Sequence, residues 1–207
     1  MSKYKKYFIK AIQSYFPNTS EEIMAEVETN YQDISIDTQF ATTSMNPIDK
    51  RLDFCAYFLA LIKTLDKQGE SFDKIRIICL NIVTEYIKPK NKWQAFLKRL
   101  PPKLINTWLA PFLLDKFNKR VSQNAHKQGF IAHIITDKNE TYGFGYGFDI
   151  LECGICKLFK KHHFEKYATI LCEVYEVTSG LAGLELIRTG TIANGAKKCD
   201  FRFKKVE

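Results

Sequence analysis

The chain has 207 residues, of which 45% are hydrophobic, so it is long enough to bury a sizeable core as one compact domain. Its formal net charge is +8, but the lysines are spread along the sequence without an arginine-rich stripe or an aromatic nucleic-acid motif, so nucleic-acid binding is not expected. No apolar run approaches the length of a membrane span, and lysines interrupt the apolar residues near the start, so we expect a cytoplasmic protein without a membrane partner.

Residues 1–128 carry hydrophobic side chains at helical spacing and predict a helical region. The first helix is expected over residues 4–16, and a capping-box pattern at 19–22 predicts the start of the second. A third helix is expected to follow Pro47 and to end at Gly69, and a fourth is expected over residues 72–87. A last, strongly apolar helix is expected from Leu104 to Phe117, interrupted or kinked at Pro111.

Two β-rich runs follow, at residues 130–136 and 142–150, and together they predict a hairpin. Glycine alternates with aromatic residues from Tyr142 to Phe148. Glycine at every second position removes the side chains from one face of a strand, so another element can approach closely there. The sequence leaves open whether that element is a packed helix, a neighbouring backbone or a ligand.

The remaining residues predict two helices, broken near His162 and His163, and then a closing hairpin. Alternation along the last strand sends Cys199, Phe201 and Phe203 to one face, and it sends Asp200 and Arg202 to the other. The elements together predict an α+β fold. Its N-terminal helical layer, residues 1–128, packs on a C-terminal unit, residues 129–207, of about four antiparallel strands with helices on one face.

The chain contains six cysteines, which in the absence of an export signal are expected to be reduced thiols. Cys55 and Cys79 lie on apolar helical faces and are expected in the core. Cys153 and Cys156 have the spacing of zinc knuckles and redox dithiols, but a second ligand pair is not evident. Cys172 and Cys199 would complete four sulfur ligands at spacings that fit no standard zinc ribbon, so we expect no metal and no cofactor.

The pattern Leu-x-Arg-Thr-x-Thr-Ile-x-x-Gly-x-x-x-Cys-Asp-Phe-Arg-Phe, from Leu186 to Phe203, resembles the C-terminal signature of the L-2-amino-thiazoline-4-carboxylic acid hydrolase family. Cys153 and Cys172 extend the resemblance, because their spacing is similar to that of two further cysteines in the family. The resemblance is clear over about residues 125–207. It implies a hydrolase-like protein that opens a small cyclic amidine such as a thiazoline carboxylate.

This chemistry needs a group that attacks the amidine carbon, or activates water to attack it, and a cation that holds the substrate carboxylate. A thiol is a candidate nucleophile if a positive charge or a helix N-terminus lowers its pKa. An arginine can hold a carboxylate through two parallel hydrogen bonds. The candidate catalytic residues are Cys153, Cys172, Cys199, Asp200 and Glu176, and the candidate substrate-binding residues are Arg188, Arg202, Thr189 and Thr191.

A second reading comes from another class of protein. The arrangement of hairpins, helix and late cysteines is also similar to the vinyl-reductase-like sensor domains, which implies a small-molecule-binding module without chemistry. A polar cleft that bears Asp200 and an arginine would favour catalysis, and a closed aromatic cavity would favour sensing. A structural or interaction protein without a pocket is the third possibility.

Overall fold

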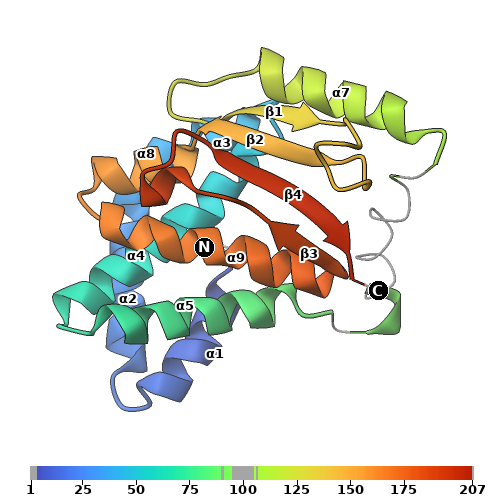
Figure 1. Ribbon diagram of the computed structural model, residues 1–207. Coiled ribbons are helices and arrows are strands. Elements are labelled where there is room, and N and C mark those ends of the chain that lie inside the picture. Colours follow the sequence, from blue (N-terminus) through green and yellow to red (C-terminus); the bar gives the residue numbers. More distant parts are fainter. Residues whose placement is uncertain (1–3, 90, 95–104, 106, 207) are drawn as a thin grey trace.

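The structure, a computed structural model, describes residues 4–89, 91–94, 105 and 107–206. Figure 1 shows a four-stranded antiparallel sheet with helices against one face and with α7 (Ala110–Gln123) alongside the edge strand β1 (Ile131–Ile135). The predicted α+β class and the four strands are therefore confirmed. No helix in the described ranges combines the length and the apolar character needed to cross a lipid bilayer.

The helices of the front region are α1 (Lys5–Tyr15), α2 (Ser20–Ser35), α3 (Phe40–Thr43), α4 (Leu52–Lys67), α5 (Phe72–Ile87) and α7 (Ala110–Gln123). They pack around the helix α4 with one exception, α7, which lies against the edge strand β1. Helix α4 is buried along most of its length because α2, α5 and the later helix α8 (Gly154–Lys161) all contact it. Gly69 ends the helix as predicted, with a φ of +82° that few other residues adopt without strain.

The sheet comprises β1 (Ile131–Ile135), β2 (Gly147–Glu152), β3 (Leu184–Ile187) and β4 (Cys199–Lys205) in the order β1-β2-β4-β3. Between the two hairpins lie α8 (Gly154–Lys161) and α9 (Ala168–Leu181), so the predicted break near His162 is confirmed. Phe201 of β4 stacks on Phe148 of β2, with ring centroids 4.5 Å apart, and Tyr175 of α9 packs edge-on against Phe201. These rings mark the inner face of the sheet, which the helices cover.

Two details of the sequence-based prediction are wrong. Residues 142–146 form a turn instead of a strand, because Tyr142, Gly143 and Gly145 have positive φ angles, and β2 begins only at Gly147. Pro111 lies in the first turn of α7, where its missing N–H costs nothing, so it starts the helix and does not kink it. Leu104, the predicted start of that helix, lies outside the described residues. The second helix begins where the pattern at 19–22 predicts, since Thr19 directly precedes α2, but the Thr19 side chain makes no capping hydrogen bond.

Gly147 explains part of the glycine pattern. A Cβ atom at this position would lie 2.7 Å from the carbonyl oxygen of Phe201 and 2.9 Å from Cδ of Arg202. Real Cβ contacts are longer than this, so only glycine fits without a shift of the neighbouring strand. Of the alternatives that the sequence leaves open, close approach of a neighbouring backbone is the one realised at Gly147.

A buried polar junction connects the helical front to the sheet. Asn46 Nδ2 donates to the carbonyl of Phe130 at 3.1 Å, and the N–H of Phe130 donates to Asp49 Oδ1 at 2.9 Å. Asp49 and Asn46 are both fully buried. Gly129 must be glycine here, since a Cβ atom would lie 2.5 Å from Asp49 Oδ1. The junction fixes the short 3₁₀ turn Asp49–Arg51, and with it the direction in which Arg51 leaves the start of α4.

Candidate functional site

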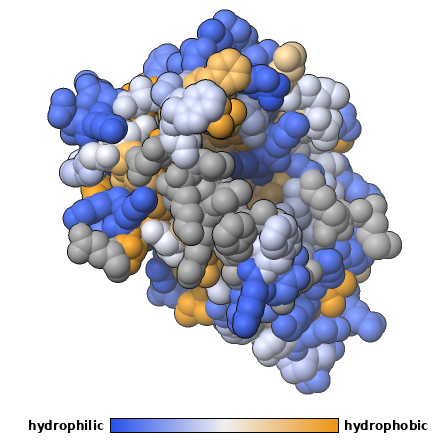
Figure 2. Space-filling model, turned by 90° about the vertical axis from the view of Figure 1, so that its right-hand side faces the viewer, coloured by the Kyte–Doolittle hydropathy of each residue, from blue (hydrophilic) through white to orange (hydrophobic). Residues whose placement is uncertain are grey.

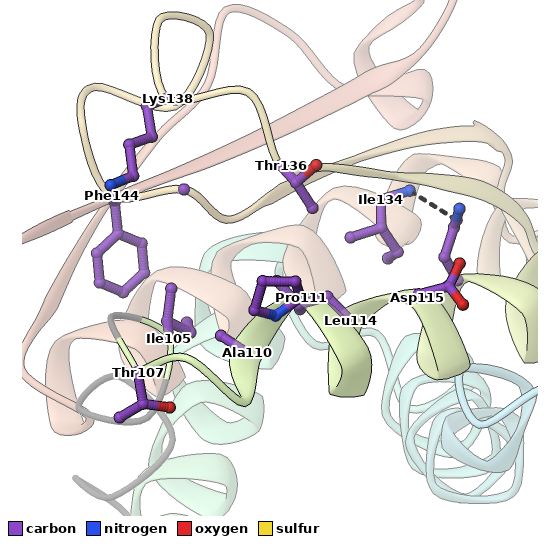
Figure 3. A pocket seen from close by; sticks show the side chains of 12 residues that line it. Ile105, Thr107, Ala110, Pro111, Leu114, Asp115, Ile134, Thr136, Lys138 and Phe144 are labelled. Atoms are coloured by element: carbon purple, nitrogen blue, oxygen red, sulfur yellow. Dashed lines mark hydrogen bonds between the residues drawn. The ribbon is translucent and has the colours of Figure 1, made fainter.

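A cavity of about 610 Å³ lies between the N-terminal half of α7 and the strand β1 with the loop that follows it. Figure 3 shows Ala110, Pro111 and Leu114 on the helix facing Thr136 and Phe144 across this space. The helix is held to the strand by the N–H of Ile134, which donates to Asn118 Oδ1 at 3.3 Å. None of the candidate residues from the sequence lines this cavity, so its size alone does not make it the reaction site.

A second cavity, of about 310 Å³, lies where the start of α4, the end of α5 and the middle of α9 meet. Arg51, Cys55 and Tyr175 line it together with apolar side chains that include Phe54 and Leu171. Arg51 and Tyr175 also line a void of about 40 Å³ against the inner face of the sheet. The two residues therefore stand between the cavity and the sheet.

Arg51 is the distinctive group of this cavity. Its Cζ lies 5.1 Å from the centroid of the Tyr175 ring, an arrangement in which the ring face attracts the guanidinium. No carboxylate of the described residues pairs with Arg51, and the side chain is solvent-accessible. Arginine is normally charged in proteins, so the cavity presents an unpaired cation beside an apolar wall.

The other polar groups of the cavity are held in their protonated forms. Burial raises the pKa of the Cys55 thiol far above its ordinary value, and it raises the pKa of the Tyr175 phenol to about 12. The Tyr4 phenol also lines the cavity, and its pKa is raised first by burial and then by the charge of Asp53. Asp53 accepts a hydrogen bond of 2.6 Å from the Tyr31 hydroxyl. A carboxylate therefore lies just behind the cavity wall.

The three cysteines of the family pattern converge from separate elements. Cys153 precedes α8, Cys172 lies on α9 and Cys199 begins β4. Cys153 and Cys199 are close enough to Cys172 to raise its pKa, and Cys153 also raises the pKa of Cys199. Cys55 belongs to the same group, since Cys153 and Cys172 both contribute to its raised pKa. Cys55 lines the cavity at Arg51, so this group of cysteines connects that cavity to Cys199 of the C-terminal signature.

The environment of these thiols raises their pKa values. Burial is the main cause for Cys172, whose pKa is raised to about 12, and for Cys199, whose pKa is raised to about 11. For Cys153 the main cause is a hydrogen bond with the Cys156 thiol, followed by burial. A nucleophilic cysteine needs the opposite shift, because the thiolate is the reactive form. All three thiols are therefore protonated at neutral pH.

Arg188 and Glu176 connect the β3–β4 hairpin to α9. Arg188 Nη1 donates to the carbonyl of Cys172 at 3.0 Å, and Nη2 donates to Glu176 Oε1 at 2.6 Å. The Thr191 hydroxyl is buried beside the Cys172 thiol without a regular hydrogen bond. The N–H of Ile192 donates to Cys199 Sγ at 3.1 Å. Both ends of the Arg188 guanidinium are thus engaged within the protein.

Arg202 lies on the outer face of the sheet, opposite the thiols, as the alternation along β4 predicts. Its Nη1 forms a 2.9 Å ion pair with Asp149 Oδ1, and its Nε donates to the carbonyl of Glu140 at 3.1 Å. Lys198 Nζ contacts the other oxygen of Asp149 at 2.6 Å. Arg202 is therefore occupied by partners on the far side of the sheet from Cys199.

Asp200 and Thr189 close the connection between β3 and β4. The carboxylate of Asp200 accepts hydrogen bonds from the N–H groups of Thr189 and Gly190, at 2.9 and 3.1 Å, and from the Thr189 hydroxyl at 2.8 Å. Burial opposes ionisation of Asp200, but these donors outweigh it and hold its pKa below the ordinary value. The Asp200 side chain therefore stabilises the loop between β3 and β4 through these hydrogen bonds.

Replacing Asp200 by alanine is expected to lower the free energy of unfolding by about 2 kcal/mol, because two backbone donors and a hydroxyl lose a charged acceptor. Urea unfolding followed by circular dichroism would measure this loss. Since folding lowers the pKa of Asp200, its contribution is complete above the pKa of the unfolded chain and is lost as the pH falls through the folded pKa. An unchanged unfolding midpoint would show that the hydrogen bonds of Asp200 do not stabilise the protein.

The residues that sequence reasoning missed are Arg51, Tyr175, Asp53 and Tyr4. One signal was available, because Arg51 stands four residues before Cys55, at the head of a buried helical stripe, where a charged residue is unusual. The placement of α9 against this stripe depends on tertiary packing, which the sequence alone did not reveal. Within the described part of the chain, no three His, Cys, Asp or Glu side chains are placed to hold a metal ion.

Comparison with known proteins identifies a family. The family model described as L-2-amino-thiazoline-4-carboxylic acid hydrolase matches residues 50–203, a range that begins one residue before Arg51 and contains all three converging cysteines. Neither the curated proteins nor the solved structures contain a match. The matched range covers more than half of the sequence and includes the signature hairpin. The chain therefore belongs to the L-2-amino-thiazoline-4-carboxylic acid hydrolase family.

Proposed function

We propose that the protein hydrolyses a small cyclic amidine that carries a carboxylate, such as a 2-aminothiazoline carboxylate, in the cavity at Arg51. The observation that carries this proposal is an arginine that pairs with no carboxylate of the described residues, in a cavity of about 310 Å³. A cavity of this volume suits a small heterocycle, and the apolar side chains opposite Arg51 suit the ring. Family membership supports the hydrolytic reaction.

We assign the anchoring role to Arg51 in preference to Arg188 and Arg202. Arg188 already donates to a backbone carbonyl and to Glu176, and Arg202 is paired with Asp149. A substrate carboxylate would have to displace those partners, which would leave charged groups without their hydrogen bonds. Arg51 contacts the Tyr175 ring but pairs with no carboxylate of the described residues, so an anion could bind the guanidinium without breaking an ion pair.

The proposed reaction consumes one water molecule. Its oxygen adds to the amidine carbon and one of its two protons reaches the ring nitrogen. The ring bond from this carbon to sulfur then breaks with the electron pair on sulfur, and the sulfur takes up the other proton. The product is an open-chain urea with a free thiol. We propose that Tyr4 relays the proton lost by the attacking water to Asp53, whose charge acts on the Tyr4 phenol from behind the cavity wall.

An assay of thiol release from 2-aminothiazoline-4-carboxylate would test this division of roles. Asp53→Asn is expected to lower kcat by about 100-fold, the low end of general acid–base catalysis. Cys153→Ser, Cys172→Ser and Cys199→Ser are each expected to lower it by less than about tenfold, because these thiols are protonated at neutral pH.

The control for Asp53 is Tyr31→Phe, which removes the other hydrogen bond of this carboxylate and leaves its charge in place. That variant should retain most of the activity.

The serine variants test the alternative in which a cysteine attacks the substrate. Loss of turnover by more than about a thousandfold in one of them would identify that cysteine as the nucleophile and would overturn the water mechanism. A rate that rises steeply with pH toward the thiol pKa values would point the same way.

One observation favours a second candidate, the non-catalytic binding module. Among the described residues that line the cavity at Arg51 there is no aspartate or glutamate, and most of the wall is apolar or aromatic. A site of this kind can hold a ligand without transforming it. Calorimetric binding of the thiazoline carboxylate without any release of thiol would favour this reading.

A further inference from the structure

The outward surface of α7 carries large apolar side chains that face solvent. Trp108, two residues before the helix begins, is 86% exposed, and Phe112 is 69% exposed. Leu109 and Leu113 are exposed beside them, and we call these four residues the apolar ridge. Figure 2 faces the end of the molecule at which α7 begins, and it shows apolar side chains at the surface among hydrophilic ones. Contiguous exposed apolar residues of this size mark an interaction surface.

Cations continue the same surface toward the C-terminal half of the helix. Lys116, Lys119 and Arg120 are exposed, and helical periodicity places them on the side of α7 that bears the apolar ridge. Asp115 is the acidic residue on this side, and it pairs with Lys119. Positive charge therefore prevails next to the apolar ridge, as it does over the whole chain, with its net charge of +8.

The position of α7 on the outside of the molecule favours one kind of partner over another. Helix α7 runs along the outside of the molecule beyond the edge strand β1 (Figure 1), and the exposed side chains of the apolar ridge lie on the outward side of this helical segment. An exposed helix suits a planar boundary better than a second globular surface, which would have to supply a matching groove. Tryptophan and phenylalanine beside lysine and arginine are the side chains that such a helix places at the headgroup level of a membrane.

We propose that α7 docks the protein onto an anionic lipid surface, with the helix lying in the plane of the headgroups. The apolar ridge inserts, and Lys116, Lys119 and Arg120 contact the lipid phosphates and carboxylates. This is peripheral contact, so it is compatible with the lack of a spanning helix in the described ranges. It revises the expectation of no membrane partner, which considered only segments that cross a bilayer. The inference does not depend on the proposed reaction.

The test uses the full chain with vesicles of phosphatidylcholine alone and of phosphatidylcholine mixed with phosphatidylserine. The chain has two tryptophans, so the variant Trp93→Phe leaves Trp108 as the sole reporter of insertion. We expect sedimentation with the anionic vesicles only, and a blue shift of the Trp108 emission. Removing Lys119 and Arg120 by substitution to glutamine should weaken binding by about fivefold per cation. Added salt should weaken it as well.

The double variant Trp108→Ser with Phe112→Ser should lower vesicle binding by more than about tenfold, because it removes most of the inserted apolar area. Its matched control is Ile36→Ser with Ile77→Ser, which removes two exposed apolar side chains elsewhere. Lys160→Gln with Lys197→Gln is the charge control, since both lysines are exposed and form no ion pair with a described residue. Both controls should bind as the wild type does.

Three outcomes would overturn the proposal. The first is wild-type protein that stays in solution with both kinds of vesicle. The second is a wild-type dimer in sedimentation velocity that the Trp108 and Phe112 substitutions convert to a monomer, since a second copy would then cover the ridge. The third is a fall of more than about 5 °C in the Tm of that double variant, which would show that the ridge is packed within the folded protein.

Discussion

Replacing Arg51 by methionine is expected to lower kcat/KM for a thiazoline carboxylate by about 300-fold, with most of the loss in KM. The physical reason is the removal of the charged partner of the substrate carboxylate, and truncating one side of such a pair costs about 2–5 kcal/mol. The apolar wall of the cavity remains, because methionine occupies a similar length against the Tyr175 ring. Initial rates of thiol release over a range of substrate concentrations would measure both constants.

Two further variants separate the anchor from a general effect of charge. Arg51→Lys keeps the charge but loses the planar fork, so we expect an intermediate loss. Lys50→Met removes a cation that lines the same cavity one position earlier, and it should change kcat/KM by less than about threefold if the charge makes only a surface contribution. Equal losses in Lys50→Met and Arg51→Met would show that the cavity acts through its net charge, without a specific anchor.

Replacing Asp149 by leucine is expected to lower the free energy of unfolding by about 3 kcal/mol, or about 150-fold in the folding equilibrium, which is the range for breaking a buried ion pair. The side chains of Asp149 and Arg202 are only 12% and 10% exposed, so the substitution leaves a desolvated guanidinium without its carboxylate. Chemical denaturation would measure the loss. Lys198→Met should cost less than about 1 kcal/mol, since this second partner of Asp149 is 48% exposed.

The paired variant Asp149→Leu with Arg202→Leu provides the control. Removing both charges should restore part of the stability, because neither partner is then left buried and uncompensated. Burial opposes ionisation of Asp149, but Lys198 and Arg202 outweigh it and lower its pKa. The ion pair therefore stabilises fully above the unfolded pKa, and the stabilisation is lost as the pH falls through the folded pKa. A double variant less stable than Asp149→Leu would contradict this account.

Much of the fold could be predicted because it depends on local periodicity. The apolar stripe through Cys55 gives α4, and the alternation of Cys199, Phe201 and Phe203 gives the inner face of β4. The errors arose where one local signal had two readings. The aromatic and glycine run at 142–146 suits a strand by composition, but its positive φ angles make a turn. A proline such as Pro111 can either kink a helix or start one, and in the structure Pro111 lies in the first turn of α7.

The site was harder to predict because it depends on contacts between distant segments. Motif resemblance grouped Cys153, Cys172 and Cys199, and the structure brings them together. Their raised pKa values follow from burial, which no motif encodes. Asp200 and Arg202 stand out in the signature, yet their hydrogen bonds and ion pairs lie within the protein. Arg51 lies outside the signature, and its role emerges only when α9 and the turn before α4 form one cavity.

The central claim is that Arg51 holds the carboxylate of a small heterocycle. A crystal structure of the protein with 2-aminothiazoline-4-carboxylate tests it most directly. We predict ligand density in the cavity between α4 and α9, with both carboxylate oxygens about 3 Å from the Arg51 guanidinium nitrogens. Ligand density in the larger cavity beneath α7, or a carboxylate bound to Arg188 in the hairpin, would contradict the claim.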